Sequence, residues 1–120
     1  ALERWDEAEA AFAQALETAA AGDARRRVEL AAAAAIAAEA TGDYQRALTR
    51  FEAALAEARA AGDAAMAGRI ARDMAHPLHR LGQADRAAAM LTEARTALPD
   101  DPATWLISAR LSRQQERLVD

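Results

Sequence analysis

The chain has no cysteine, no lysine and no asparagine, and aromatic residues make up only 4% of its 120 residues. The lack of cysteine excludes disulfides and thiol catalysis, and it indicates nothing about the redox compartment. With so few aromatic residues, a core has to be built from alanine, leucine, isoleucine and methionine where helices approach closely. No apolar run is long enough to cross a bilayer and no secretory signal peptide is visible, so we expect a cytoplasmic protein without a membrane partner.

The charge pattern narrows the possible partners. The formal net charge is −4 at pH 7, whereas a nucleic-acid-binding protein needs an electropositive face. Apart from two histidines, every basic side chain is arginine. This bias, together with the excess of alanine, is typical of a GC-rich bacterial genome. We therefore expect a bacterial protein that binds other proteins or peptides rather than nucleic acid.

Alanine, the strongest intrinsic helix former, supplies about a third of the chain and predicts a single all-α domain. Glycines recur at regular intervals, at positions 22, 42, 62 and 82, and aspartate follows the first three of them. Glycine can end one helix in the left-handed conformation, and aspartate can cap the next helix. These signals predict six helices, at about 3–20, 24–41, 44–61, 64–81, 84–97 and 102–118.

One apolar pattern occurs once in the second helix of each expected pair, and so three times in the chain. Its members follow each other at spacings of 3, 4 and 3, which keeps them on one helical stripe. The copies are Trp5, Ala8, Phe12 and Ala15; Tyr44, Ala47, Phe51 and Ala54; and, more weakly, Ala84, Ala87, Leu91 and Ala94. The first members of the copies define a period of roughly 40 residues, which predicts a solenoid of stacked helix pairs.

The segments from Gly42 to Leu55 and from Gly82 to Ala94, with the later Pro99, resemble the tetratricopeptide repeat. Leu81-Gly82 and Trp105-x-x-x-Ala109 also fit that family. The usual period is 34, so the helices here are longer by about a turn, as in repeats of bacterial regulatory ATPases and transcription regulators. The resemblance implies a right-handed superhelical solenoid of antiparallel helix pairs over the single domain 1–120. It divides into a half repeat at 1–22, repeats at 23–62 and 63–101, and a half repeat at 102–120.

The resemblance also implies a function and a site. Members of this family are interaction scaffolds that hold a peptide or helix in a concave groove lined by the first helix of each pair. We therefore expect no enzymatic activity, no cofactor and no metal. The candidate polar anchors are Arg69, Arg72, His76, Arg80 and Arg110, and the candidate apolar floor is Ile36 and Leu106.

These candidates predict a groove that is basic toward its C-terminal half and apolar to acidic toward its N-terminal half. Arginine forks pair bidentately with carboxylates, which would suit an acidic peptide or a C-terminal carboxylate. The alternative is that these arginines are solvated and paired within the chain. Carboxylate-clamp members of the family use lysine and asparagine, which this chain lacks. That chaperone specificity is therefore not expected. Arg72 and His76 stand where the first two clamp residues would be, which leaves a variant site for an acidic peptide open.

Two other kinds of chemistry are disfavoured. His76, His79 and Asp73 are potential metal ligands, but their spacing drifts around the helix and nearby arginines would repel a cation. No nucleophile, phosphate loop or carboxylate pair stands at a spacing useful for catalysis. Pro77 lies inside the same helical pattern and predicts a kink or a break there. A kink could turn the two histidines into the groove, or it could be a tolerated irregularity of packing.

The half repeats at 1–22 and 102–120 predict that the chain is a segment of a longer array, or that a terminal helix packs on another copy. Exposed apolar end faces would then favour homo-oligomers. Two alternatives to a groove-binding scaffold stay open on the sequence. One is a sensor or docking region of a bacterial signalling or transcription regulator, and the other is a self-assembly module.

Overall fold

The computed structural model describes residues 2–20 and 22–119. These residues form six α-helices and no strand, which confirms the predicted all-α class, and each predicted helix end lies within two residues of the observed one. The helices are α1 (Leu2–Thr18), α2 (Ala24–Ala40), α3 (Tyr44–Ala60), α4 (Ala64–Arg80), α5 (Ala84–Ala97) and α6 (Pro102–Val119).

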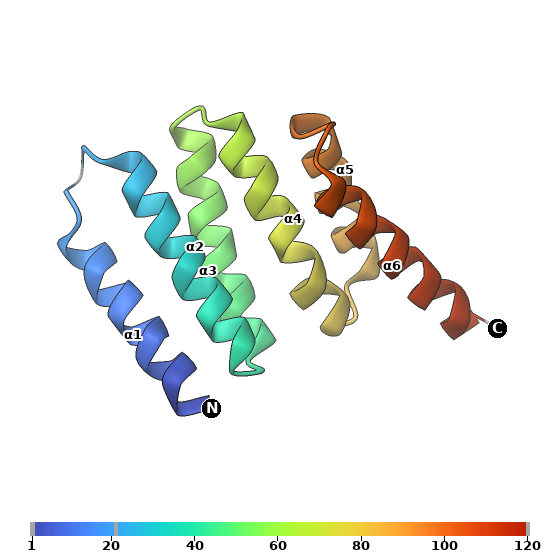
Figure 1. The fold of residues 1–120 in the computed structure, drawn as a ribbon, viewed down its shortest axis with the longest axis horizontal. Coiled ribbons are helices and arrows are strands. Elements are labelled where there is room, and N and C mark those ends of the chain that lie inside the picture. Colours follow the sequence, from blue (N-terminus) through green and yellow to red (C-terminus); the bar gives the residue numbers. More distant parts are fainter. Residues whose placement is uncertain (1, 21, 120) are drawn as a thin grey trace.

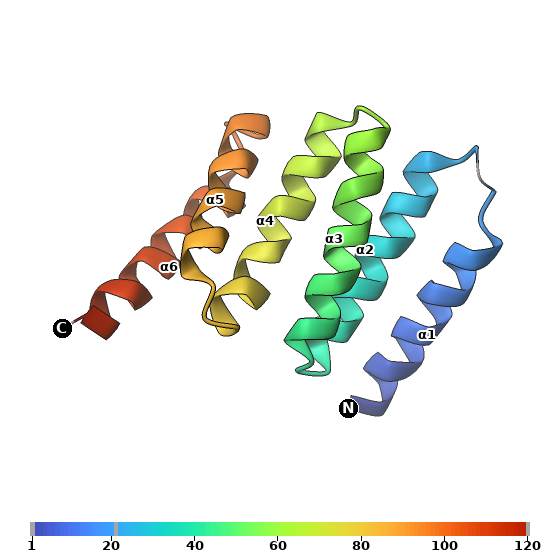
Figure 2. The same cartoon turned by 180° about the vertical axis from the view of Figure 1, so that it is seen from behind.

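The helices stand in a row that follows the order of the chain (Figure 1). Each helix packs against its neighbours in the sequence, and α4 also contacts α6. The described molecule measures 49 × 34 × 20 Å, with α1 and α6 at opposite ends of the longest dimension. Helices α2 and α6 lie in front of α3 and α5 in Figure 1 and behind them in Figure 2, so the row has two layers.

The turns between helices use the predicted chemistry with one exception. Gly42, Gly62 and Gly82 have φ of 89°, 71° and 78°, the left-handed region that glycine enters without a steric penalty. Asp43 and Asp63 accept hydrogen bonds from backbone N–H groups three residues later, at 3.0 Å each, and so cap the helices that follow.

Gly22 is the exception, and the prediction that it ends a helix is wrong. The reason is that α1 already ends at Thr18, well before this glycine. The connection to α2 is therefore longer than the other turns. Asp23 still caps α2 by accepting from the backbone N–H of Arg26 at 3.2 Å.

The core consists of many buried alanines and a few large side chains. Phe51, Leu48, Ile70, Met74 and Leu78 are essentially inaccessible to solvent. Around them lie alanines that are also buried and let the helices approach closely: Ala34, Ala35, Ala38, Ala47, Ala54, Ala58, Ala71 and Ala75. This arrangement matches the sequence, in which alanine is abundant and aromatic residues are scarce.

Helix α4 runs without interruption through Pro77, so the predicted break is wrong, and His76 keeps helical geometry. Pro77 lies in the last turn and is buried, and later backbone bonds hold that turn closed. The N–H of Leu81 donates to the carbonyl of Pro77 at 3.0 Å, and the N–H of Gln83 donates to that of Leu78 at 2.9 Å. The helix thus loses one hydrogen bond at the proline and keeps its final turn.

A buried ion pair joins α1 to α3. Glu9 is only 6% exposed, and its carboxylate lies 2.6 Å from Nε of Arg50 and 2.8 Å from Nη2 of Arg46. Burying a carboxylate is costly unless it is paired and hydrogen-bonded, and two guanidinium groups meet this need here. Arg46 also reaches Asp6 at 3.3 Å. These contacts fix the position of α1, whose apolar packing is confined mainly to α2.

Candidate functional site

A groove of about 570 Å³ opens where α2, α4 and α6 approach one another. Its walls combine apolar side chains with charged ones, and Phe51 of α3 contributes from the layer behind. The lining residues are Ile36, Glu39, Phe51, Arg72, Asp73, His76, Ile107, Arg110, Leu111 and Gln114. The helices α2, α4 and α6 are those expected to be the first of each pair.

Four of the seven candidate residues line this groove: Ile36, Arg72, His76 and Arg110. Ile36 is 48% exposed, which is unusual for an isoleucine, and Arg110 is exposed on the facing helix. Among the described residues, Arg110 makes no ion pair. These two side chains therefore offer an apolar and a cationic contact that the chain does not already use.

The other three candidates lie outside the lining. Arg80 packs over the ring of Tyr44, with its guanidinium carbon 5.3 Å from the ring centre. Tyr44 in turn meets the ring of His76 edge-on, at 5.8 Å between centroids, so Arg80 borders the groove through these two rings. Arg69 and Leu106 are exposed, and Leu106 is 50% accessible on α6.

Arg72 is largely engaged within the chain. Its Nε lies 3.1 Å from Oδ1 of Asp73, and its Nη1 lies 2.9 Å from Oδ2 of Asp101, just before α6. The Thr104 hydroxyl donates to the same Asp101 oxygen at 2.7 Å. Arg72 therefore ties α4 to the start of α6, and its charge is already balanced by two carboxylates.

Two carboxylates in the groove were not singled out from the sequence as anchors. Burial raises the pKa of Glu39, and the nearby His76 lowers it in part; His76 Nδ1 lies 3.6 Å from Glu39 Oε1. Burial likewise raises the pKa of Asp73, against the lowering effect of Arg72. The groove therefore has mixed charge. Glu39 stands about one helical turn after Ile36, and this spacing was the feature of the sequence that could have indicated its place in the groove.

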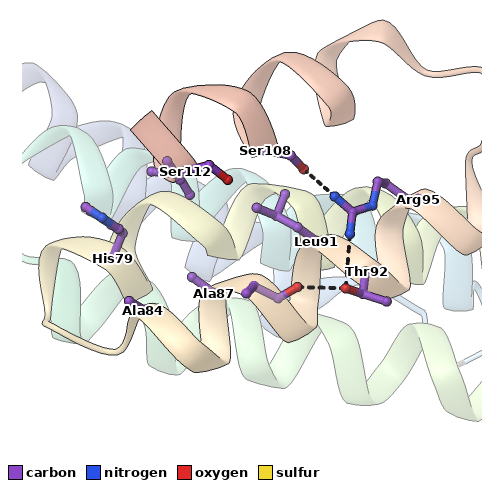
Figure 3. Close-up of a pocket in the computed structure, with 10 residues that line it drawn as sticks. His79, Ala84, Ala87, Leu91, Thr92, Arg95, Ser108 and Ser112 are labelled. Carbon is purple, nitrogen blue, oxygen red and sulfur yellow. Dashed lines mark hydrogen bonds between the residues drawn. The ribbon is translucent and has the colours of Figure 1, made fainter. Parts of the chain in front are cut away.

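A smaller pocket of about 160 Å³ lies between the end of α4, α5 and α6 (Figure 3). Arg95 extends into it and donates to Ser108 at 3.1 Å and to Thr92 at 3.2 Å. Leu91 and alanines form its apolar side. His79 lines this pocket, whereas His76 lines the groove, so the two histidines lie on different surfaces.

Within the described residues, no cluster of three or more histidine, aspartate or glutamate side chains is suited to hold a metal ion. In the same part of the chain, no helix combines the length and apolarity needed to cross a membrane. No family model, curated protein or solved structure matches this chain. The repeat pattern and the groove are the features of this chain that bear on its function.

Proposed function

We propose that this chain is a tetratricopeptide-like interaction scaffold, and not an enzyme, which holds a peptide or helix of a partner protein in the groove between α2, α4 and α6. In this proposal the six helices form a right-handed superhelix of antiparallel pairs. Three observations support the array: the repeated apolar pattern, the glycine turns at half its period, and packing mainly between neighbours in the chain.

The observation that carries the proposal is Ile36. It stands 48% exposed on the wall of a groove whose opposite wall holds Ile107 and Leu111. Exposed apolar side chains that converge in a concave site are typical of binding surfaces. A large apolar side chain of the partner would contact all three, and its burial there is the main source of affinity.

The charges favour a particular peptide. Arg72 is balanced by Asp73 and Asp101, so Arg110 is the groove cation left to pair with a carboxylate of the partner. Glu39 and Asp73 also line the groove, and their negative charges would repel a strongly acidic segment. The peptide that fits best therefore carries one acidic group near a large apolar residue, rather than a run of acidic residues.

A displayed library of random peptides, selected on the purified chain, tests this proposal. The enriched peptides should share an apolar residue close to a carboxylate. Their dissociation constants should rise about tenfold or more in Ile36→Asp and severalfold in Arg110→Ala, because each change removes one groove contact. Arg26→Ala, which truncates an exposed arginine outside the groove, serves as the matched control. Peptides that bind all three variants equally well would show that the groove is not the site.

A further inference from the structure

The helix pair α5 and α6 carries small or polar residues where the pair α3 and α4 carries core residues. In α3 and α4, four large apolar side chains belong to one buried cluster: Leu48, Leu55, Ile70 and Met74. Positions in the two pairs are matched by counting from the residue before each helix. The matching positions in α5 and α6 hold Ala88, Arg95, Ser108 and Ser112. All four of these residues line the small pocket between α5 and α6.

This exchange leaves α6 loosely packed on α5. Helices α3 and α4 pack extensively, whereas few residues of α6 contact α5. The space between them is the pocket of about 160 Å³ shown in Figure 3. An apolar filling would stabilise the fold, because burial of apolar surface is the main favourable term in folding. Proteins depart from such packing mostly at functional sites, so the residues of the pocket indicate what it binds.

Arg95 is held in a fixed orientation by neutral groups. It donates to the hydroxyls of Ser108 and Thr92, and its guanidinium carbon lies 5.3 Å from the centre of the Trp105 ring. Among the described residues, Arg95 makes no ion pair, and the nearby Glu93 pairs with an arginine of α3 instead. A guanidinium has five N–H donors, and the two hydrogen bonds use two of them. Arg95 therefore keeps donors and a positive charge for an anion.

The rest of the lining also suits an anion with a short apolar part. None of the described residues that line the pocket is an aspartate or a glutamate. Ser112 supplies another hydroxyl, and His79 stands near it, away from Arg95 in Figure 3. Between these polar ends, Leu91 and Ala87 form an apolar side. The pocket thus combines hydrogen-bond donors and a cation with an apolar surface.

We propose that the pocket between α5 and α6 binds a small organic carboxylate, with its anionic group on Arg95 and its apolar part on Leu91 and Ala87. Arginine pairs with carboxylates through two parallel hydrogen bonds. The pocket is smaller than the 300–1,000 Å³ typical of sites for drug-sized ligands, so the ligand has only a few carbon atoms. The pocket shares Leu111 alone with the lining of the groove, so the proposal does not depend on peptide binding there.

Butyrate is the probe that tests this proposal, with acetate and inorganic phosphate for comparison, all at pH 7 and constant ionic strength. Trp105 reports on the site because its ring lies against Arg95, and Trp5→Phe removes the other tryptophan of the chain. Titration with butyrate should change the Trp105 fluorescence until it saturates. Acetate and phosphate should bind severalfold more weakly, because neither has an apolar part long enough to cover Leu91.

Variants of Arg95 show whether the guanidinium is the anchor, with binding followed by NMR signals of butyrate so that the readout does not depend on Trp105. Arg95→Leu should fold, because leucine occupies the matching position in α3, and should raise the dissociation constant about tenfold or more. Arg95→Lys keeps the charge without the fork and should raise it severalfold. The matched control is Arg86→Leu on the same helix; Arg86 pairs with Glu52 at 2.9 Å, outside the pocket, and its loss should leave binding unchanged.

A repacked variant gives an independent check. Ala88→Leu, Arg95→Leu, Ser108→Ile and Ser112→Met together install the residues of α3 and α4, and they should fill the pocket, abolish binding and raise the midpoint of thermal unfolding. A wild type without saturable butyrate binding, an Arg95→Leu protein that binds as tightly as the control, or a repacked variant that still binds would overturn the proposal. Phosphate that binds as tightly as butyrate would overturn the assignment to an organic anion.

Discussion

Single small residues decide how closely the helices approach, and Gly68 is the clearest case. It is buried between α4 and α5, and an added methyl would lie 2.6 Å from Cβ of Ala97 and 3.4 Å from Cγ of Leu98. A Cβ cannot rotate away from such a contact, so the helices would have to separate. Two opposite effects have to be compared. Overpacking costs about 1–3 kcal/mol, and the better helix propensity of alanine returns about 1 kcal/mol.

A Cβ–Cβ contact of 2.6 Å places the cost at the upper end of its range, so Gly68→Ala should lower the free energy of unfolding by about 1–2 kcal/mol, measured by urea denaturation followed by circular dichroism. Gly22→Ala is the control, because no atom lies within 4 Å of the added methyl and the residue is outside the helices. The control should change stability by less than about 0.5 kcal/mol. A Gly68→Ala protein as stable as the control would contradict the close packing of α4 on α5.

At this scale the sequence predicts some residues well and others poorly. The glycine turns and aspartate caps are local features, so three of the four glycines and all three aspartates are found as expected. Glu9 is different. It stands where the repeated pattern has the buried Leu48, and its partner Arg50 lies in a helix that is distant in the sequence. A contact between such distant positions has no local signal, so the buried ion pair was not predicted.

At the scale of single helices, the position of α6 depends on Asp101. The hydrogen bond from Thr104 and then the contact with Arg72 lower the pKa of Asp101 below its ordinary value of 3.8. A carboxylate whose pKa is lowered by folding stabilises the fold above its ordinary pKa. That contribution is lost as the pH falls through the lowered value.

Peptides from α6 should therefore lose protection from hydrogen exchange, corrected for intrinsic rates, as the pH falls from about 6 to below about 3. Peptides from α3 provide the internal control, since α3 does not depend on this contact. Asp101→Asn should reduce protection of α6 at the higher pH and remove most of its pH dependence. Equal protection of α6 at both pH values in the wild type would refute the role of Asp101.

Glu39 and Asp73 act in the opposite direction. Burial raises the pKa of both, so each takes up a proton more readily in the folded chain than in the unfolded one. Their effect on stability is therefore favourable at low pH and is lost as the pH rises through the raised values. A pH titration of global stability will contain both effects, and only the local measurement on α6 separates them.

The six helices themselves were predictable because their start and stop signals recur with a fixed period. Pro77 was predicted to kink or break α4, and the helix does not break there. The proline is buried in the last turn, where hydrogen bonds from Leu81 and Gln83 to the helix keep the turn closed. Tertiary packing outweighed a local cost of roughly 3 kcal/mol.

At the scale of the whole molecule, α6 is the most loosely attached part of the row. Few of its residues contact α5 and α4, and the polar pocket around Arg95 separates it from α5 along part of its length. Its side chains toward α5 include Ser108 and Ser112, which cannot replace a buried apolar contact.

A chain shortened to 1–98 should consequently keep a cooperative unfolding transition and lose only about 1–2 kcal/mol of stability, as expected for a few apolar contacts. A chain shortened to 1–81 should be far less stable, because α5 packs extensively on α4 and its removal uncovers the α4 surface around Gly68. Thermal unfolding of the two shortened chains compares them directly. Similar losses from both would contradict the weak attachment of α6.

The lining of the groove was only partly predictable, because the spacing of the repeats changes before α6. Positions on α2 and α4 follow the repeat, and Ile36, Arg72 and His76 all line the groove. The connection through Pro99 shortens the next interval, so that Asp101 follows Asp63 more closely than Asp63 follows Asp23. The lining of α6 therefore consists of Ile107, Arg110, Leu111 and Gln114, and Leu106 lies outside it.

The row of helices in chain order has a consequence for how the protein forms. Nearly all contacts between helices join helices that follow each other in the chain, so little entropy is lost in closing loops. Chains with such local topology cross their folding barrier in microseconds to milliseconds. Each helix can also find its neighbour soon after synthesis, because the growing chain need not wait for a distant segment to emerge.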